Sequence, residues 1–484
     1  MNYKMIGKIL SPLLLIEVAF MVPALALCLY DGSQAAARGF MIAMALTLFV
    51  SGVLRLITKD ARPGFYAREG LVLTGLTWIV MSILGCLPFC ISGEIPSFID
   101  ALFEMVSGFT TTGSSILPEV ESLSRGILYW RSFSHWVGGM GVLVFLMAIV
   151  PLSGKNEGFT LHILRAESPG PSVGKLVPRM KNTARILYWL YVILTVLDFL
   201  FLLVGGMPWF AALCHAFGTA GTGGFGVLND SYASYSPYLI NVTTVFMLLF
   251  GVNFSCYYLL LLKHFRDVFA DEELRTYIGI VVGSTALITL GIRGLYPTLG
   301  EAIRHAAFQV GSIISTTGYA TADTNVWPPF VKALMMFLMI CGASAGSTGG
   351  GMKVARIILA MKALRRNIHE NLHPTEVSRV RFNKAPMDER VIKNLNGYLV
   401  AYFTIVILSF LVVSLDGFSV ETNISAVLAT FNNIGPGFDA VGSTSNFSAY
   451  GTLSKLVFIA DMLAGRLEIF PILILASRST WTRR

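Results

Sequence analysis

The sequence has few charged residues for its length. Of 484 residues, only 13% are Asp, Glu, Lys or Arg, whereas 54% are hydrophobic. A water-soluble domain usually carries about 25% charged residues, so roughly half of the usual polar covering is missing. This shortage excludes an ordinary soluble protein. It also leaves no basic soluble domain to bind a nucleic acid, although the net charge is +8.

Cysteine is also scarce, and its spacing carries no pairing signal. The six cysteines lie in or beside apolar runs, and none forms a CxxC pair. We therefore expect free, packed thiols rather than a disulfide framework or a zinc site.

Long apolar segments, in contrast, are abundant. A helix needs about 20 mostly apolar residues to cross a bilayer. Ten runs are mostly near this length, and we interpret them as ten membrane crossings: residues 9–30, 39–57, 70–92, 127–151, 186–206, 239–262, 277–292, 331–345, 397–415 and 456–476.

The positions of Lys and Arg indicate an orientation. With the N-terminus placed in the cytoplasm, most of the 36 basic residues fall in cytoplasmic segments, which is the positive-inside pattern of membrane proteins. We therefore predict a multi-pass protein with both termini cytoplasmic. The longest cytoplasmic connections, 152–182 and 353–394, are too short and too basic to be folded domains.

One unit recurs four times after the first two helices. It consists of an apolar helix, a short loop, a half-length apolar segment, a polar turn with glycine, and a second apolar helix. The half-length segments end in FTTTGSS (109–115), FGTAGTG (217–223), ISTTGYA (314–320) and FNNIGPG (431–437). When these ends are aligned, one column contains Gly113, Gly221, Gly318 and Gly435.

The half-length segments predict re-entrant helices. The stretches from Ser97 to Asp100 and from Thr298 to Glu301 have the form of capping boxes at helix starts. A helix of about 12 residues is only about 18 Å long, which is roughly half a membrane, so the chain must enter and return.

We therefore predict an all-α integral membrane protein with four pseudo-symmetric repeats of helix, pore helix, filter turn and helix. Two extra transmembrane helices precede the repeats. The expected divisions are 1–58 for the two leading helices, 59–152 for repeat 1, 183–265 for repeat 2, 274–364 for repeat 3 with a broken second helix, and 394–478 for repeat 4.

The four turns have the chemistry of a cation filter. Backbone carbonyls can replace the water around a cation without adding net charge. Glycine permits the positive φ that aims successive carbonyls in one direction, and the C-terminal ends of four pore helices favour a cation. The turns contain neither Lys nor Arg, so nothing there suits an anion. The predicted filter residues are Thr110, Thr111, Thr112, Gly113, Thr219, Ala220, Gly221, Thr222, Ser315, Thr316, Thr317, Gly318, Asn432, Asn433, Ile434 and Gly435.

The ends TTTGSS, STTGYA and NNIGPGF, each closing a pore helix, resemble the degenerate filters of the Trk/Ktr/HKT superfamily of cation transporters. The two leading helices and the segment CGASAGSTGGGMK (341–353) resemble TrkH-type bacterial subunits in particular, and the resemblance spans essentially the whole chain. It implies potassium uptake at the bacterial inner membrane, a homodimer, and regulation by a cytosolic nucleotide-binding TrkA-type subunit. Potassium is then the bound ion, held by backbone carbonyls, and no organic cofactor is expected.

The segment 341–351 predicts a gate. Its sequence CGASAGSTGGG cannot sustain a helix at about 1 kcal/mol per glycine, so it must interrupt the second helix of repeat 3 beside water or protein. Arg466 is expected at the same depth, where its charge repels cations and its donors hold carbonyls of the loop. The alternative is a close-packing site, with Arg466 paired to Asp461 or Glu468. The predicted gate residues are Gly342, Gly346, Gly349, Gly350, Gly351 and Arg466.

Acidic residues also occur inside other apolar runs, where a charge is expensive. We expect them to serve as packing or polar anchors rather than as ion ligands: Glu17, Glu104 and Asp198.

The basic stretch 353–394 is expected to dock the regulatory subunit that the resemblance implies. Attraction of the same charges to anionic membrane lipid is the alternative explanation.

Three motif matches indicate other activities but lack the required context. Residues 221–226 satisfy GxGxxG, yet they follow an apolar half-helix with no preceding strand, so we expect no dinucleotide site. Residues 346–353 have methionine where a P-loop requires glycine. His369 to His373 form a literal HExxH, which on a helix could hold zinc, but Pro374 follows at once and no third ligand is evident.

The expected function is potassium-selective transport through a central channel-like pore, gated by the intramembrane loop and regulated from the cytosol. The alternative is a secondary transporter that couples potassium entry to sodium or protons, a class usually built from inverted repeats with broken helices. Four repeats of one orientation favour the pore. An enzyme is not expected, because that interpretation depends on the HExxH match alone.

Overall fold

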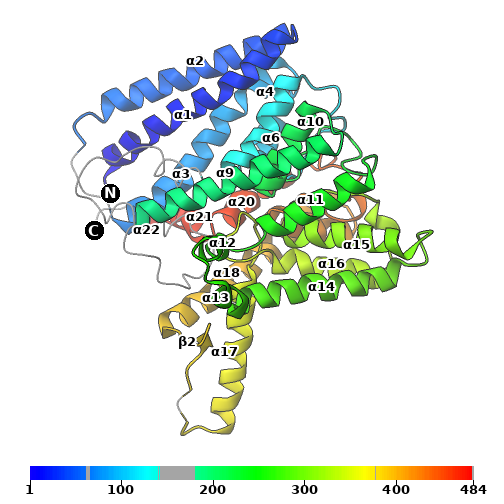
Figure 1. The fold of residues 1–484 in the computed structure, drawn as a ribbon. Coiled ribbons are helices and arrows are strands. Elements are labelled where there is room, and N and C mark those ends of the chain that lie inside the picture. The colour runs from blue at the N-terminus through cyan, green and yellow to red at the C-terminus, as the bar shows by residue number, and fades with distance from the viewer. Residues whose placement is uncertain (62–65, 140, 142–179, 377, 482–484) are drawn as a thin grey trace.

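The computed structural model describes residues 1–61, 66–139, 141, 180–376 and 378–481. Within these residues the regular structure is helical except for one hairpin of two short strands, β1 (Arg381–Phe382) and β2 (Ala385–Pro386). The predicted helical membrane fold is therefore confirmed, and Figure 1 shows its elements coloured along the chain.

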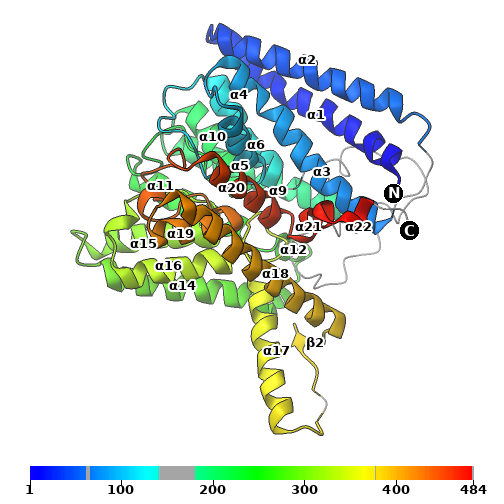
Figure 2. The same cartoon turned by 180° about the vertical axis from the view of Figure 1, so that it is seen from behind.

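Two long helices open the chain and lie side by side along one edge of the molecule (Figures 1 and 2). They are α1 (Tyr3–Tyr30) and α2 (Gln34–Ile57). Ser11 Oγ donates to the carbonyl oxygen of Ser51 at 3.0 Å, and Ser51 Oγ donates to that of Ser11 at 2.8 Å. This reciprocal pair satisfies both buried hydroxyls and fixes the contact between the two helices.

The same order of elements then occurs four times. A long helix opens each unit: α3 (Ala67–Gly85) with α4 (Leu87–Ser92), α9 (Met180–Val204), α14 (Glu272–Ile292) and α18 (Glu389–Val413). A half-length helix follows: α5 (Phe98–Phe109), α10 (Trp209–Gly221), α15 (Leu299–Ile314) and α19 (Val420–Phe431). A second apolar helix comes last: α6 (Arg125–Gly139), α11 (Pro237–Phe250), α16 (Pro329–Cys341) and α20 (Thr452–Arg466).

The remaining helices are short or lie outside this order. They are α12 (Phe254–Leu261), α13 (Phe265–Ala270), α17 (Val354–Leu372), α21 (Phe470–Ala476), α22 (Arg478–Trp481) and the 3₁₀ turns η1 (Thr324–Val326), η2 (Ser414–Asp416) and η3 (Asp439–Val441).

The half-length helices begin where their sequences predict. Ser97 Oγ accepts a hydrogen bond from the N–H of Asp100 at 3.4 Å, and Thr298 Oγ1 accepts one from the N–H of Glu301 at 3.2 Å. Such caps satisfy donors that the first helical turn leaves free. Both α5 and α19 contain 12 residues, so each rises about 18 Å and reaches only about halfway across a bilayer.

Several second helices are broken partway along. Six helices in the described part of the chain are long and apolar enough to cross a membrane, or seven if the bent pair α11 and α12 counts as one span. That pair is bent by 89° at residues 251–253. Helix α16 ends at Cys341, and helix resumes only at Val354. Between α20 and α21, Glu468 and Ile469 have positive φ. Ten apolar runs therefore do not give ten unbroken helices, because helix breaks fall inside some of them.

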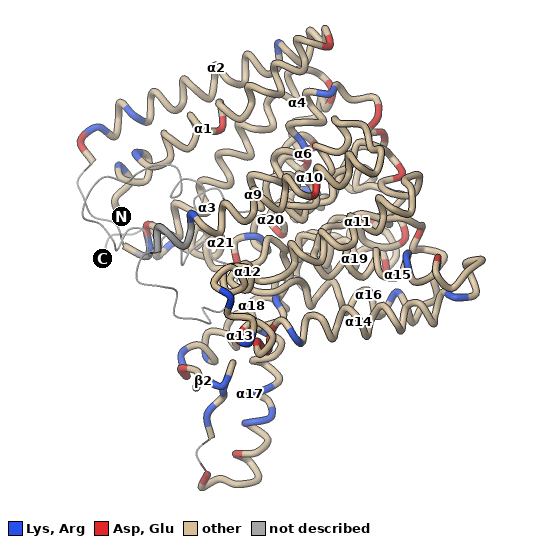
Figure 3. Tube along the Cα trace, in the orientation of Figure 1, with Lys and Arg blue, Asp and Glu red and all other residues tan. Residues whose placement is uncertain are grey.

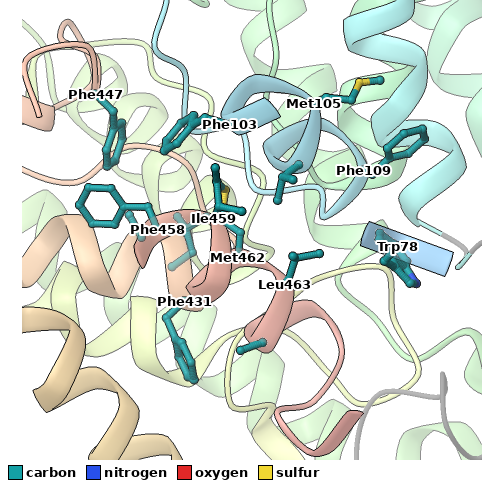
Figure 4. Close-up of a cluster of buried hydrophobic side chains, with 14 of the residues drawn as sticks. Trp78, Phe103, Met105, Phe109, Phe431, Phe447, Phe458, Ile459, Met462 and Leu463 are labelled. Carbon is teal, nitrogen blue, oxygen red and sulfur yellow. The ribbon is translucent and has the colours of Figure 1, made fainter. Parts of the chain in front are cut away.

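Buried hydrophobic side chains, several of them aromatic, pack between the half-length helices and the second helices (Figure 4). Phe103 on α5 lies 6.5 Å from Phe458 on α20 between ring centroids, and Phe447 lies 5.4 Å from Phe458. All three side chains are buried. This apolar packing holds α5 and α20 together near their midpoints and so helps to position the turn that follows α5.

Charged residues are concentrated at the ends of the helices, as Figure 3 shows. Helix α17 projects away from the other helices together with the β1–β2 hairpin, and it carries several Lys and Arg residues (Figures 1, 2 and 3). The other long connection predicted to be cytoplasmic, 152–182, lies almost wholly outside the described residues.

Candidate functional site

Each half-length helix ends in a turn with the same backbone conformation. One residue in every turn has φ between 53° and 61°, and these residues are Thr111, Thr222, Thr316 and Asn433. A glycine with positive φ follows two positions later: Gly113, Gly224, Gly318 and Gly435. The N–H of the residue between them donates to the carbonyl five positions earlier at 2.8 to 2.9 Å, in the pairs Thr112 to Ser107, Gly223 to Gly218, Thr317 to Ser312 and Ile434 to Ala429. The four turns are therefore equivalent residue by residue.

This alignment of the four turns corrects the glycine that the sequence assigned to the column in repeat 2. The sequence alignment assigns Gly221 to the column, which is wrong, because Gly221 lies in the last turn of α10 and Gly224 occupies the equivalent position. Thr219 and Ala220 lie in the same helical turn and are buried. Of the residues predicted for this repeat, only Thr222 belongs to the turn itself.

A sequence signal for the correct register does exist. Gly224 is followed by Phe225, just as Gly318 is followed by Tyr319 in the third turn. Phe225 is therefore an aromatic residue of the second turn, although the register predicted from the sequence gives this turn no aromatic.

The four turns close into a ring in chain order. Each column glycine lies so close to a carbonyl oxygen of the next turn that a Cβ would be too near it or collide with it. In ring order, the glycines and the residues whose carbonyls they face are Gly113 with Gly223, Gly224 with Thr317, Gly318 with Ile434 and Gly435 with Thr112. Only glycine fits this approach and the positive φ together.

Side chains join the first and fourth turns directly. Asn433 Nδ2 donates to Thr112 Oγ1 at 2.9 Å, and Ser114 Oγ donates to the carbonyl oxygen of Gly435 at 2.8 Å. These two bonds connect segments that are far apart in sequence. The ring is therefore closed by side-chain hydrogen bonds as well as by contacts between backbones.

The ring places one backbone carbonyl oxygen of each turn against the column glycine of the turn before it. Four carbonyl oxygens, from Thr112, Gly223, Thr317 and Ile434, belong to four equivalent turns. Each turn follows the C-terminal end of a half-length helix, where the helix dipole places partial negative charge. Thus the predicted residues of the first, third and fourth turns are brought together, and those of the second are displaced along the chain.

The predicted gate loop lies directly against the third and fourth turns. The N–H of Gly350 donates to Thr316 Oγ1 at 2.6 Å. A Cβ on Gly349 would lie 2.7 Å from the carbonyl oxygen of Ser315, and one on Gly350 would collide with that of Asn432. The loop therefore interrupts the helix as predicted and fits beside the turns only because both residues are glycine.

The bend between α11 and α12 supplies acceptors for the same loop. The N–H of Ser344 donates to the carbonyl oxygen of Gly251 at 3.0 Å, and Thr348 Oγ1 donates to that of Phe250 at 3.2 Å. In return, the N–H of Phe254 donates to the carbonyl oxygen of Gly346 at 3.1 Å. The bend and the loop thus satisfy backbone groups that two interrupted helices leave free.

Arg466 contacts the loop, as expected from the sequence. Its Nη1 donates to the carbonyl oxygen of Thr348 at 2.8 Å, and its Nη2 donates to the carbonyl oxygen of Gly139 at 2.9 Å. The two carboxylates that the alternative interpretation pairs with Arg466 contact other residues. Asp461 accepts a hydrogen bond from Ser409 Oγ at 2.7 Å, and Glu468 forms an ion pair with Arg356.

Two further side chains hold the loop, and sequence reasoning missed both. Glu273 is buried, and its Oε1 accepts the N–H of Ala345 at 2.6 Å and that of Ala355 at 3.1 Å, so it holds both ends of the loop. Lys353 Nζ donates to the carbonyl oxygen of Gly349. Glu273 lies in the first turn of α14, distant in sequence, and gives no local signal of this contact.

The HExxH match lies on α17 and its C-cap. The ring centroids of His369 and His373 are 4.8 Å apart, and His369 Nε2 lies 3.0 Å from Glu376 Oε2. Among the residues that the structure describes, no group of three or more His, Cys, Asp or Glu is arranged to hold a metal ion. The GxGxxG match at 221–226 lies where α10 ends and the second turn follows, without a strand.

Relatives with curated descriptions match over the whole chain. The Trk system potassium uptake protein TrkH of Salmonella typhimurium is 34% identical, with 99% of this chain and 100% of the relative covered. The protein of the same description from Halomonas elongata is also 34% identical, with 100% of both chains covered. These relatives are ion transport proteins rather than enzymes.

A solved structure matches the fold equally well. The crystal structure of the potassium transporter TrkH from Vibrio parahaemolyticus superposes with a TM-score of 0.88, at 31% identity and with 100% of both chains covered. The family model described as "TrkH: Cation transport protein" matches residues 36–281 and 295–482. The chain therefore belongs to the TrkH family of cation transport proteins.

Proposed function

We propose that this protein carries potassium ions across the membrane through the ring of four turns. The closure of the ring carries the proposal, because four equivalent carbonyls meet where four half-length helices end. Backbone carbonyls at such a point replace the hydration shell of a cation without net charge. The relatives that match over the full length are described as potassium uptake proteins, which identifies the cation.

The loop at 342–353 is proposed as the gate below this filter. It contacts the third and fourth turns through Gly349 and Gly350. Arg466 adds a positive charge beside the loop and donates to Thr348. A loop in this place blocks the ion path sterically, and the guanidinium repels an approaching cation.

The cytosolic side is proposed to dock a regulatory protein of the TrkA type. The projecting helix α17 and the β1–β2 hairpin support this proposal because they are basic and extend beyond the other helices. The hairpin also contacts α14, since the N–H of Glu272 donates to Asn383 Oδ1 at 2.8 Å. Glu272 is followed by Glu273, which holds the loop, so a displaced hairpin is proposed to act on the loop through these two residues.

The assembly and topology remain predictions within the same proposal. We propose a homodimer in the bacterial inner membrane with both termini cytoplasmic. The divisions proposed for the chain are 1–58, 59–152, 183–265, 274–364 and 394–478. Consistent with these divisions, the order of helix, half-length helix, turn and helix recurs four times.

Flux into liposomes tests the proposal. Purified protein should pass potassium down its gradient, and it should pass sodium much more slowly. Gly318→Ser should relax this selectivity about tenfold, equivalent to about 1.4 kcal/mol between the two ions, because the new side chain collides with the neighbouring carbonyl in the ring.

The matched control is Gly417→Ser, which has the same positive φ but nothing within 4 Å of the new side chain. A folded Gly318→Ser variant with parental selectivity would contradict the filter assignment. Flux that requires a sodium or proton gradient would favour the coupled-transporter alternative.

A further inference from the structure

A buried ion pair connects the segments that follow the column glycines of the first and second turns. Arg131 Nε on α6 donates to Glu104 Oε1 on α5 at 2.5 Å, and both side chains are almost fully buried. A buried pair of charges is stable only when hydrogen bonds satisfy the remaining polar atoms. Both partners therefore need further contacts, and these contacts indicate what the pair does.

The carboxylate holds the chain that leaves the first turn. Glu104 Oε2 accepts the N–H of Ile116 at 3.0 Å and the hydroxyl of Ser115 at 3.1 Å. Ser115 follows Ser114, whose hydroxyl donates to the carbonyl oxygen of Gly435 in the fourth turn. Glu104 thus fixes the segment that begins two residues after the first column glycine.

The guanidinium holds the equivalent segment of the second turn. Arg131 Nη1 donates to the carbonyl oxygen of Gly226 at 3.2 Å. The Cζ atom of Arg131 lies 3.5 Å from the ring centroid of Phe225, which is a close cation–π contact. Phe225 directly follows the column glycine Gly224, so a shift of the guanidinium would shift the carbonyls of this turn.

The pair is specific to one half of the ring. Glu104 precedes Thr111 by the same interval as three other residues precede the equivalent positions in their turns, namely His215, Gln309 and Ala426. Among the described residues, the ion pair occurs only at the first of these four places. The third and fourth turns instead contact the gate loop.

We propose that Glu104 and Arg131 act together as positioning residues that set the ion selectivity of the filter, by holding the first and second turns in register. This inference rests on the proposed filter function and deepens it. In this proposal neither side chain is an ion ligand. The pair acts through the backbone of residues 115–116 and 225–226.

Conservative substitutions test the pair without leaving a cavity in its place. Arg131→Lys retains a positive charge beside Glu104, but an ammonium has no planar fork to reach Gly226 while it stacks on Phe225. The potassium-to-sodium flux ratio in liposomes should fall about tenfold in Arg131→Lys, with melting temperature and elution volume close to those of the parent. Glu104→Gln, which keeps the shape and removes the charge, should lower the ratio at least as far.

The matched control is an ion pair at the rim. Lys332 Nζ lies 3.0 Å from Glu421 Oε1, and the side chain of Glu421 is 43% exposed. Glu421 lies in the first turn of α19, at the opposite end of that helix from the fourth turn. Glu421→Gln removes one charge of this pair, so its flux ratio should stay within about twofold of the parent.

The outcomes separate the inference from the proposed function. A parent protein without selective potassium flux would refute the filter itself. A selective parent together with a folded Arg131→Lys variant of unchanged ratio would overturn only the positioning role. Failure of both Arg131→Lys and Glu104→Gln to fold would assign the pair to stability and would also overturn it.

Discussion

The ring of four turns, proposed as the filter, and the loop at 342–353, proposed as the gate, are both made of glycine-rich backbone, yet they are held in different ways. In the ring, four equivalent turns close on one another, and each glycine is fixed by the carbonyl of its neighbour. The loop occurs once and is held by hydrogen bonds from separate elements, among them Glu273 of α14, Arg466 of α20 and the bend between α11 and α12. We therefore expect the ring, which closes on four equivalent contacts, to be rigid. We expect the loop to be released when a few of its separate contacts are lost.

The largest effect is expected from breaking the ring at its corrected position. Gly224→Ala forces a side chain against the carbonyl of Thr317 at φ +79°, and we expect it to abolish selective potassium flux. Strained backbone of this kind costs about 1–3 kcal/mol before the collision is added. Liposome flux, with thermal unfolding measured in parallel, checks the prediction.

Gly206→Ala is the matched control for this change. Gly206 has φ +84°, but nothing lies within 4 Å of an added Cβ. It should lose only some stability and keep its selectivity. Equal loss of selectivity in the two variants would mean that backbone strain, and not the ring, is responsible.

Removing the charge beside the loop should have the next largest effect. Arg466→Ala deletes the donor to Thr348 and, with it, the positive charge that we propose repels entering ions. We expect basal potassium flux, without any cytosolic partner, to rise by about 5- to 150-fold, the range of typical coupling energies. Arg293→Ala, at an exposed helix end, serves as the control. Folded Arg466→Ala protein with parental basal flux would exclude Arg466 from the gate.

A smaller rise in basal flux is expected when the hydrogen bonds between Glu273 and the loop are weakened. Glu273→Gln keeps an acceptor oxygen for Ala345 and Ala355 but loses the charge that strengthens both bonds. Charged hydrogen bonds exceed neutral ones by about 1 kcal/mol, so a severalfold rise is expected. Glu272→Gln, the adjacent residue that pairs with Lys362 instead, should leave basal flux near the parental value. Identical flux in both variants would remove Glu273 from the gate.

The smallest change in basal flux is expected from the cytosolic surface. Charge reversal at Arg365 and Arg379, in the basic segment of α17 and its following loop, should leave selectivity and basal flux unaltered. The same variant should fail to co-purify with a TrkA-type partner. Retention of the partner would locate the docking surface elsewhere. Unchanged partner binding together with a weaker dependence of flux on anionic lipid would indicate that lipid explains the charges.

Much of the ring was predictable, because its signals are local. Capping residues, half-length apolar segments and a polar turn identify the four units, and the glycine run at 341–351 identifies the helix break. The register of the second turn was not fixed by glycine alone, since glycine occurs at 218, 221, 223, 224 and 226. The pairing of glycine with the following aromatic was the better guide.

The contacts between elements could not be read from the sequence. The bend at residues 251–253 has a single glycine, which is too weak a signal to predict a break. Glu104 was expected to be a polar anchor, but its partner Arg131 and the segments that they hold come from separate elements. Glu273 meets the loop only after the chain has folded, so its role requires the three-dimensional arrangement.

The central claim is that an ion binds within the ring and that Gly223 and Gly224, rather than Gly221, form the second turn of this ring. Crystals of the parent protein grown in rubidium, an electron-dense substitute for potassium, allow the ion to be located by anomalous scattering. The account predicts a peak on the ring axis surrounded by the carbonyls of Thr112, Gly223, Thr317 and Ile434. A peak surrounded instead by carbonyls of the last turn of α10, at residues 219–221, or no peak in the ring of protein that conducts rubidium, would contradict it.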